Sequence, residues 1–433
     1  HSNNTDVSPP VYFLSLEVRN VLCFEKRQRL DLSDGNKKPS YFNIILGDNG
    51  TGKTTLLKCL AGLEPIMSRL SKVEIVGDYE DFPIYSILGY KHNLARGRKY
   101  RNELLEANFF LQKKESEILN YAYTYDSIAL SSENHEDLGN LKINSYSASR
   151  KIGKGNLMGL PNNGNQINIF EGDVSLINAE EWFLQTNSIY KNAEGIIQQK
   201  AKARFDKVKQ ILTDLLPDVF DIRIKPIEED FKLLVEAKTH YGWVALQQLS
   251  IGYQTMMAWI VDFAFQMFER YPKSINPLEE PAIALVDEID LHLHPNWQRR
   301  ILQYLAKYFP KTQFIVTAHS PLVVQSAPND ANVILLQRIE VPDGDDYVSI
   351  SKPIRAVKGW SIEEILTDLM GLENVRSDEY VQLLKDFEEA LEDDQTENAS
   401  EIYKKLDALL HPQSNMRQVL KIQLSSVGGL LIK

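Results

Sequence analysis

A short glycine-rich stretch carries the clearest chemical signal in the sequence. Residues 47–54 read GDNGTGKT and match the pattern G-x-x-x-x-G-K-[ST]. Glycines let the backbone turn tightly, so that its N–H groups converge on phosphate oxygens, and the lysine can reach the outer phosphates. A hydroxyl at Thr54 suits Mg²⁺, and the helix expected to begin here favours an anion. The stretch predicts a site for ATP and Mg²⁺. The expected contact residues are Gly47, Asp48, Asn49, Gly50, Thr51, Gly52, Lys53, Thr54 and Thr55.

Two acids follow a second apolar run. Residues 281–295 read PAIALVDEIDLHLHP, and the apolar part predicts a buried strand with Asp287 and Glu288 at its carboxyl end. In a phosphate-loop ATPase the first acid would hold Mg²⁺ through water, and the second would polarise the attacking water. A competing interpretation is a metal site, because alternate residues of an extended segment share a face. Its ligands would be Asp287, Asp290, His292 and His294. We favour the ATPase, because the phosphate loop already accounts for the acids.

Two further polar groups stand at ends of predicted elements. The stretch KTQFIVTAHS predicts a buried strand that ends at His319, from which an imidazole can reach a γ-phosphate. Residues 248–254, QLSIGYQ, form a polar turn before a long apolar helix. The hydroxyl of Ser250 and the backbone N–H of Gly252 lie where a helix N-terminus could hold an anion.

The rest of the chain supplies the elements that would position these groups. Alternation over residues 11–32 predicts a β-hairpin before the phosphate loop, in which Phe24 could stack on adenine or simply pack. Helices are predicted over 102–125 and 179–216, and strands over 219–247. We therefore expect an α/β fold.

The predicted domain organisation has three parts. Residues 1–10 are polar and are expected to be disordered. Residues 11–350 would form the ATPase head, with a helical and loop insertion over 90–218. Residues 351–433 read as helices without a catalytic pattern and predict a docking or dimerisation region.

Composition restricts the possible functions. The net charge is −11, from 48 basic and 59 acidic residues, which argues against a general charge-driven nucleic-acid binder. The two cysteines make neither a disulfide framework nor a zinc site and suit a reducing cytoplasm. No apolar run approaches the roughly 18 residues of a membrane-spanning helix. The densest basic run, residues 91–101, could contact nucleic acid, although a solvated face is the simpler interpretation.

The order of the motifs resembles the ATP-binding-cassette (ABC) class of P-loop ATPases over about residues 11–340. LSIGYQ is similar to the cassette signature, IALVDE to the Walker B strand, and AHS to the switch-histidine loop. The resemblance implies an ABC-type head, a mixed sheet with flanking antiparallel strands, carrying an inserted helical arm and a C-terminal helical bundle. It also implies that two heads pair head to tail. Each ATP would then lie between Lys53 of one chain and Ser250 and Gly252 of the other. In this scheme Glu288 is the general base, Thr54 and Asp287 serve Mg²⁺, and His319 senses the γ-phosphate.

Within that class, the sequence resembles bacterial AAA-family ATPases related to the overcoming-lysogenization-defect, Rad50 and SMC heads. DEIDLHLHP is similar to the family's DE-x-x-x-x-LHP, and YSASR to its Tyr-Gly-x-x-Arg turn. EEWFL at 180–184 and GWSIEEILTDLMGL in the tail resemble segments of the ATPases that accompany nucleases in Septu-type and retron-linked anti-phage systems.

The sequence departs from its relatives at several points. Transporters of the class carry a glutamine loop; none is assigned here, and YSASR could occupy its region with Arg150 near the nucleotide. At the dimer loop a transporter-like Asp would fall at His294. The interval from Thr55 to Leu249 is too short for the coiled coils of Rad50 and SMC proteins. The tail shows no nuclease domain, so a nuclease would be another chain.

The sequence therefore predicts a slow, regulated, cytoplasmic ATPase that gates a partner effector, a nuclease, in anti-phage defence, with no membrane association. Two alternatives remain open. An SMC- or Rad50-like ATPase would act directly on DNA in repair or maintenance, and a transporter subunit would bind a membrane protein.

Overall fold

The computed structural model describes residues 11–428 with gaps at 20, 37, 62–64, 67–83, 86–105, 115–116, 125–142, 151, 154–168, 170–174, 228–231, 343, 354–356 and 358. The chain divides into two compact units, His1–Trp360 and Ser361–Lys433. The first unit contains the predicted phosphate loop and both predicted acids. The basic run at 91–101 lies outside the described residues.

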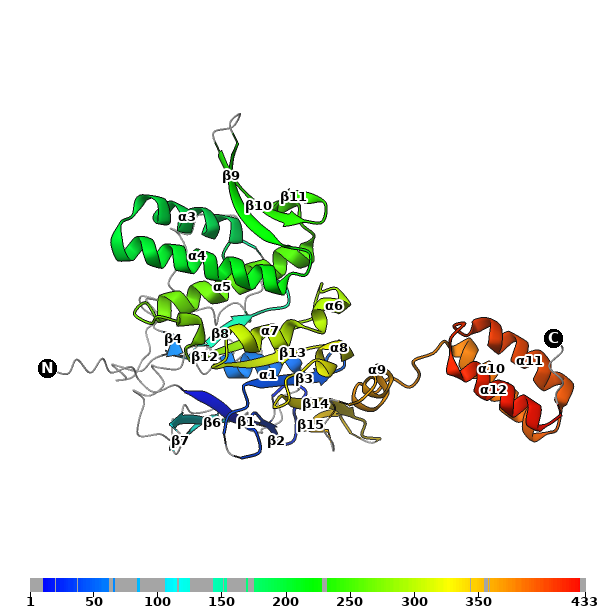
Figure 1. The fold of residues 1–433 in the computed structure, drawn as a ribbon. Helices are drawn as coiled ribbons and strands as arrows, with labels where there is room; N and C mark the ends of the chain where they lie inside the picture. The colour runs from blue at the N-terminus through cyan, green and yellow to red at the C-terminus, as the bar shows by residue number, and fades with distance from the viewer. Residues whose placement is uncertain are drawn as a thin grey trace. The chain divides into compact units, whose positions relative to one another are not determined.

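A six-stranded mixed sheet forms the centre of the first unit (Figure 1), in the order β15-β14-β3-β13-β12-β8. Its strands are β3 (Phe42–Gly47), β8 (Ile143–Tyr146), β12 (Ala282–Val286), β13 (Thr312–Thr317), β14 (Asn332–Ile339) and β15 (Tyr347–Ser351). All neighbours are parallel except β14 and β15, which pair antiparallel. The strands β12 and β13 are buried along their whole length, as expected for near-continuous apolar runs in a parallel sheet. The carboxyl ends of β3, β8, β12 and β13 therefore meet at one edge.

A four-stranded antiparallel sheet flanks this core, in the order β2-β1-β6-β7. Its strands are β1 (Tyr12–Arg19), β2 (Gln28–Asp31), β6 (Glu106–Lys114) and β7 (Glu117–Thr124). The predicted hairpin over 11–32 is confirmed, with Leu16 opposite Leu30. The predicted helix over 102–125 is wrong, because this segment forms β6 and β7 and β6 pairs with β1. A long-range strand pairing decides its structure, and local periodicity does not reveal such a partner.

Helix α1 (Lys53–Ala61) follows β3 directly through the phosphate loop. Its leucines Leu56, Leu57 and Leu60 are fully buried in a core shared with residues of the flanking antiparallel sheet, including Phe13 and Leu16. Burial of several such side chains, each contributing about 1.5–3 kcal/mol, fixes the helix against both sheets. The N-terminus of α1 is thus held rigidly at the edge where the strands end.

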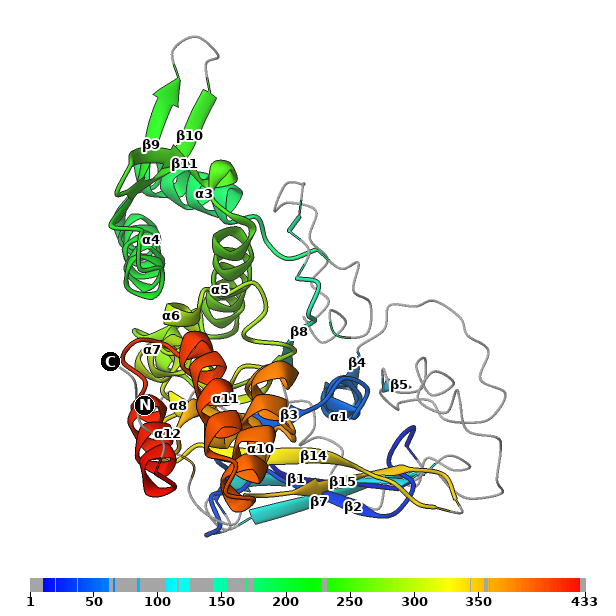
Figure 2. The ribbon, with the colours of Figure 1, turned by 90° about the vertical axis from the view of Figure 1, so that its right-hand side faces the viewer.

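A helical arm extends away from the other side of the central sheet (Figures 1 and 2). It contains α3 (Ala179–Asn192), α4 (Gly195–Leu215) and α5 (Ile251–Arg270), and a three-stranded sheet of β9 (Asp221–Ile227), β10 (Lys232–Thr239) and β11 (Gly242–Ala245). The side chain of Asn178 caps α3, and Trp182 and Phe183 are buried beneath it. The helices predicted over 179–216 and the strands over 219–247 are confirmed.

The remaining helices of the first unit are short, apart from one two-turn helix. They are η4 (Leu246–Gln248), η5 (Pro277–Glu279), α6 (Pro295–Gln298), α7 (Ile301–Tyr308) and α8 (Pro321–Gln325), and a two-stranded pair joins β4 (Pro65–Ile66) to β5 (Ile84–Tyr85). No helix within the described segments is long and apolar enough to cross a bilayer.

The second unit is helical. It contains α9 (Ile362–Glu364), η6 (Ile365–Leu369), α10 (Asp378–Glu392), α11 (Thr396–Leu409) and α12 (Asn415–Ser426). The three longer helices enclose their own apolar core, in which Phe387, Leu406 and Leu424 are fully buried. The α/β class, the flanking antiparallel strands and the C-terminal bundle are as the sequence predicts. The helices α3 and α4 lie within the insertion predicted over 90–218, but so do β6, β7 and β8, which belong to the two larger sheets of the first unit.

Candidate nucleotide-binding site

The phosphate loop has the tight geometry that its glycines imply. Both the backbone N–H and the hydroxyl of Thr51 donate to the carbonyl of Asp48, at 3.3 and 2.8 Å. Gly52 has φ 87°, in the left-handed region, and a Cβ added there would lie 2.5 Å from Cys23 Sγ and 2.7 Å from the ring of Phe24. Phe24 is fully buried. It therefore packs beneath the loop, and the adenine-stacking interpretation is wrong for this conformation.

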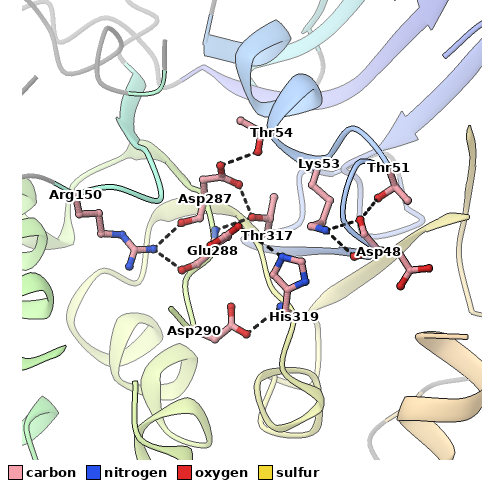
Figure 3. Close-up of polar contacts among 11 residues, drawn as sticks. Asp48, Thr51, Lys53, Thr54, Arg150, Asp287, Glu288, Asp290, Thr317 and His319 are labelled. Carbon is pink, nitrogen blue, oxygen red and sulfur yellow. Dashed lines mark hydrogen bonds and ion pairs between the residues drawn. The ribbon is translucent and has the colours of Figure 1, made fainter. Parts of the chain in front are cut away.

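Lys53 is bound to the loop that precedes it (Figure 3). Its Nζ donates to the carbonyls of Gly47 and Asp48, at 2.6 and 2.9 Å. Burial lowers the pKa of Lys53, and the charges of Asp287 and Glu288 oppose that effect. The ammonium of Lys53 is held by two neutral carbonyls beside the tight turns of the loop. It can therefore exchange these carbonyls for charged phosphate oxygens.

The carboxylate of Asp287 joins the phosphate loop to the neighbouring strand. Its Oδ2 accepts a hydrogen bond from the Thr54 hydroxyl at 2.7 Å, and its Oδ1 accepts one from the Thr317 hydroxyl at 2.6 Å. Mg²⁺ prefers oxygen ligands such as a hydroxyl and a carboxylate. Thr54 and Asp287 lie within hydrogen-bonding distance of each other, so this pair fits the ion. Thr317 was not predicted, although its place at the end of a strand beside the acids could have indicated it.

Glu288 is held in an unusual backbone conformation. Its φ is 47°, which is uncommon for a residue with a side chain. Its N–H donates to the Thr317 hydroxyl at 2.7 Å. Its Oε1 lies 3.6 Å from Nε2 of His319, and both side chains are about one third exposed. A carboxylate and an imidazole thus face each other beside the phosphate loop, as a base and a phosphate sensor require.

The loop that carries His319 is fixed by Gln298, which was not predicted, and by Asp290, which was predicted only as a possible metal ligand. The backbone N–H of His319 donates to Asp290 Oδ2 at 2.9 Å, and the hydroxyl of Ser320 donates to Gln298 at 2.6 Å. Gln298 in turn donates to the carbonyls of Asp290 and Leu293. The segment after the acids and the segment after β13 are therefore held together.

Arg150 lies across the two acids from Lys53 (Figure 3). It follows β8, whose neighbour in the sheet is β12, the strand that leads to the acids. Its Nη2 donates to the carbonyls of Asp287 and Glu288, both at 2.6 Å, and the side chain is only 2% exposed. We expected Arg150 near the nucleotide, but its guanidinium binds the backbone of the acids.

The predicted signature turn begins α5. Ser250 is exposed at the N-cap position, where its side chain makes no capping hydrogen bond. Gly252 is buried, and a Cβ there would lie 2.4 Å from the carbonyl of His292. Within the described part of the chain, no hydrogen bond joins Ser250 or Gly252 to Lys53 or the acids. The structure brings together the phosphate loop, both acids and His319, and leaves the signature turn outside that network.

The competing metal-site interpretation lacks support. Among the residues that the structure describes, no group of three His, Cys, Asp or Glu side chains could hold a metal ion. His294 Nδ1 accepts from the backbone N–H of Asn296 and caps α6, while Asp290 binds the backbone of His319. These contacts explain two of the four proposed ligands as structural.

Comparison with known proteins agrees with this geometry. A family model described as "AAA domain, putative AbiEii toxin, Type IV TA system" matches residues 172–325, and a second AAA domain model matches residues 15–63. These ranges include the signature turn, both acids, His319 and the phosphate loop.

Three curated proteins are similar to the chain. The "Septu protein PtuA" of Bacillus thuringiensis is 26% identical over 90% of this chain and 93% of its own length. The "Retron Ec83 probable ATPase" of Escherichia coli is 36% identical over 51% of this chain and 39% of its own length, so the match spans well under half of that relative. The "Retron Vc95 probable ATPase" of Vibrio cholerae is 24% identical over 88% of this chain and 85% of its own length.

The similarity thus extends over nearly the whole chain in two of the three relatives, and the two matching domain models include the loop, the acids and the histidine that the structure brings together. The chain is an ATPase, and it is similar in sequence to the Septu and retron ATPases.

Proposed function

We propose that this ATPase binds Mg²⁺-ATP in a head-to-tail homodimer and uses the nucleotide to gate a partner effector, a nuclease, in bacterial anti-phage defence. The observation that carries the proposal is the continuous network from Thr54 through Asp287 and Thr317 to Glu288. It fixes the general base relative to the loop that would bind the phosphates.

The side chains around the phosphate loop and the acids have defined tasks in hydrolysis. Lys53 exchanges its loop carbonyls for β- and γ-phosphate oxygens. Thr54 and Asp287 would hold Mg²⁺, and the ion would supply positive charge that offsets the charge of the phosphates. Glu288 accepts a proton from the attacking water at its carboxylate, and Nε2 of His319 contacts the γ-phosphate and orients Glu288.

The second half of each site would come from the partner chain. Ser250 is exposed and its hydroxyl is not used in capping α5, so it remains available to a γ-phosphate. The N-terminus of this long helix also favours an anion. ATP between two heads orders both surfaces at once, which suits a slow hydrolytic switch.

The defence role rests on the kind of relatives that the chain has. Two of those relatives are retron ATPases, and a third is a Septu protein. The helical unit after Trp360 has its own core and supports the proposed docking region of residues 351–433. The proposed head is residues 11–350.

Replacing Glu288 with glutamine tests the proposal. The Glu288→Gln variant keeps the shape of the side chain but cannot accept a proton, so turnover should fall by roughly 10²- to 10⁴-fold. ATP binding should persist, and an ATP-bound dimer should accumulate in size-exclusion chromatography with light scattering. Glu279→Gln, an exposed substitution elsewhere in the head, is the control. Normal ATP turnover by Glu288→Gln would exclude Glu288 as the base.

The effector is tested by native mass measurement of the protein purified with the products of its neighbouring genes. A second protein with nuclease activity that co-elutes at fixed stoichiometry supports the gating role. A chain that runs alone and pairs only with ATP and DNA contradicts it and favours a DNA-repair ATPase.

A further inference from the structure

Arg150 is a fully buried arginine. Within the described residues, its side-chain hydrogen bonds go to backbone carbonyls and not to carboxylates. Its Nη2 donates to two carbonyl oxygens, those of Asp287 and Glu288, both at 2.6 Å. Burial lowers the pKa of Arg150 to about 10, an effect opposed by the charges of Asp287, Asp290 and Glu288. The guanidinium therefore stays charged at neutral pH. Burying a charge is costly unless it is paired, so a specific task at this position is expected.

The two carbonyls belong to the backbone that sets the direction of the Glu288 side chain. Glu288 has a left-handed φ of 47°, a conformation that costs of order 1–3 kcal/mol and persists only where surrounding contacts enforce it. The Thr317 hydroxyl accepts a hydrogen bond from the N–H of Glu288, and Arg150 donates to the carbonyl of Glu288. Both polar backbone groups of Glu288 are thus held. This fixes the carboxylate 3.6 Å from His319.

The segment that carries Arg150 is anchored at its other end. The carbonyl of Tyr146 accepts the N–H of Asp287 at 2.9 Å. The hydroxyl of Tyr146 donates to Asp262 Oδ2 in α5 at 2.9 Å, and both residues are buried. Because β8 is fixed both to the acids and to the helix of the signature turn, Arg150 approaches the acids from a rigid base.

We propose that Arg150 is a positioning residue for hydrolysis, which holds the backbone of Glu288 so that its carboxylate faces the attacking water. The proposal rests on the proposed role of Glu288 as the general base. Arg150 binds no phosphate in this account, so it acts on the rate of the chemical step and leaves nucleotide affinity unchanged.

The test compares two substitutions at this position. Arg150→Met keeps a long side chain but donates no hydrogen bond, and kcat should fall roughly 10- to 100-fold while KM for ATP stays within about threefold. Arg150→Lys can still donate to the two carbonyls and should recover part of kcat. If Arg150→Met does not fold, as judged by thermal melting, Arg150→Lys alone must lower kcat without raising KM. Loss of ATP affinity with kcat unchanged, in either variant, overturns the proposal.

Gln313→Met is the matched control, because it also removes a buried side chain that donates hydrogen bonds to backbone carbonyls. Gln313 is also fully buried and also donates to two carbonyls, those of Phe13 and Ser40, at 2.8 and 3.2 Å. It lies near the start of β13, whereas Thr317 and the acids lie at the carboxyl ends. Its substitution should lower the melting temperature and leave kcat unchanged. An equal loss of kcat in Gln313→Met would show that Arg150 only stabilises the fold and has no positioning role.

A double variant separates this proposal from the proposed function. If Arg150 acts through Glu288, Arg150→Met added to Glu288→Gln should lower kcat no further. Additive losses overturn the positioning role. If Glu288→Gln itself turns over normally, the proposed function fails. If Glu288→Gln is inactive while Arg150→Met keeps the wild-type kcat, only the present proposal fails.

Discussion

On the phosphate-loop side, each proposed catalytic side chain is held by another part of the same chain, whereas the turn at the start of α5 presents an exposed Ser250 whose side chain makes no such contact with the described residues. Asp287 is 4% exposed and both of its carboxylate oxygens accept hydrogen bonds. Ser250 caps α5 without using its hydroxyl. In the proposed dimer, one half of the site is complete in a single chain, and the exposed Ser250 of the other half would meet the nucleotide of the partner chain.

If the site is divided between two chains as proposed, this difference gives the ATPase a means of regulation. A fully enclosed site in one chain would turn over whenever ATP is present. A site divided between two chains turns over only when they meet, so anything that changes their pairing changes the rate. The phosphate loop, the two acids and Thr317 form what we call the enclosed half of the site. Substitutions in the enclosed half should change ATP binding, stability or chemistry within one chain. Substitutions in the turn should change only the activity of the paired chains.

The largest expected effect is that of Lys53→Ala. Removal of the ammonium leaves phosphate charge without its main partner and should cost about 4 kcal/mol, roughly a thousandfold in the Kd for ATP. Lys58→Ala, on the same helix and only partly exposed, is the control. Titration with a fluorescent ATP analogue measures both. Unchanged affinity in Lys53→Ala would show that the loop does not bind the phosphates.

A smaller effect is expected when a methyl group is added within the phosphate loop. Gly50 and Gly52 both have left-handed φ, 81° and 87°, but a Cβ at Gly50 meets nothing within 4 Å, whereas one at Gly52 meets Cys23 and Phe24. Gly52→Ala should therefore lower the free energy of unfolding by about 2 kcal/mol more than Gly50→Ala does. Chemical denaturation measures the difference. Equal values would mean that the loop is not tightly packed against the hairpin.

The smallest effect concerns a hydroxyl of the enclosed half. Thr317→Val removes the group that joins Asp287 to the N–H of Glu288 and should lower kcat roughly tenfold. Thr312→Val is the matched control, because its hydroxyl, at the other end of β13, is buried without a hydrogen-bond partner. That variant should keep kcat and stability. Similar steady-state rates for the two variants would contradict the role given to Thr317.

Sequence reasoning identified the residues whose chemistry is local and missed those whose role depends on neighbours. The phosphate loop, the two acids and His319 follow strands whose apolar runs are unmistakable, and the parallel arrangement brings their ends together. Thr317 and Asp290 act through contacts between strands and loops far apart in the chain. The sequence named Asp290 only as a possible metal ligand, and Thr317 was not predicted although it ends a strand beside the acids. Arg150 was expected near the nucleotide, yet its direction depends on β8 pairing with β12.

The same limit explains the one large error in the fold. The segment over 102–125 has apolar residues at spacings that suit a helix, with a charged run, QKKESE, between them. In the structure β6 ends at Lys114 and β7 begins at Glu117. The register of β6 against β1, with Phe109 opposite Leu16, involves residues nearly a hundred positions away. The secondary-structure propensity of residues 102–125 alone cannot reveal that they pair with β1.

Mixing two inactive variants tests the divided site most directly. Lys53→Ala disables the enclosed half, and Ser250→Arg blocks the turn at an exposed position that tolerates a larger side chain. Each variant alone has no intact site, but a mixed pair has one, formed by the loop of one chain and the turn of the other. Equal mixing should restore about a quarter of the wild-type ATPase rate, because half of the pairs are mixed and each has one site of two. If the mixture remains as inactive as its components while mixed pairs form, the two halves do not come from different chains.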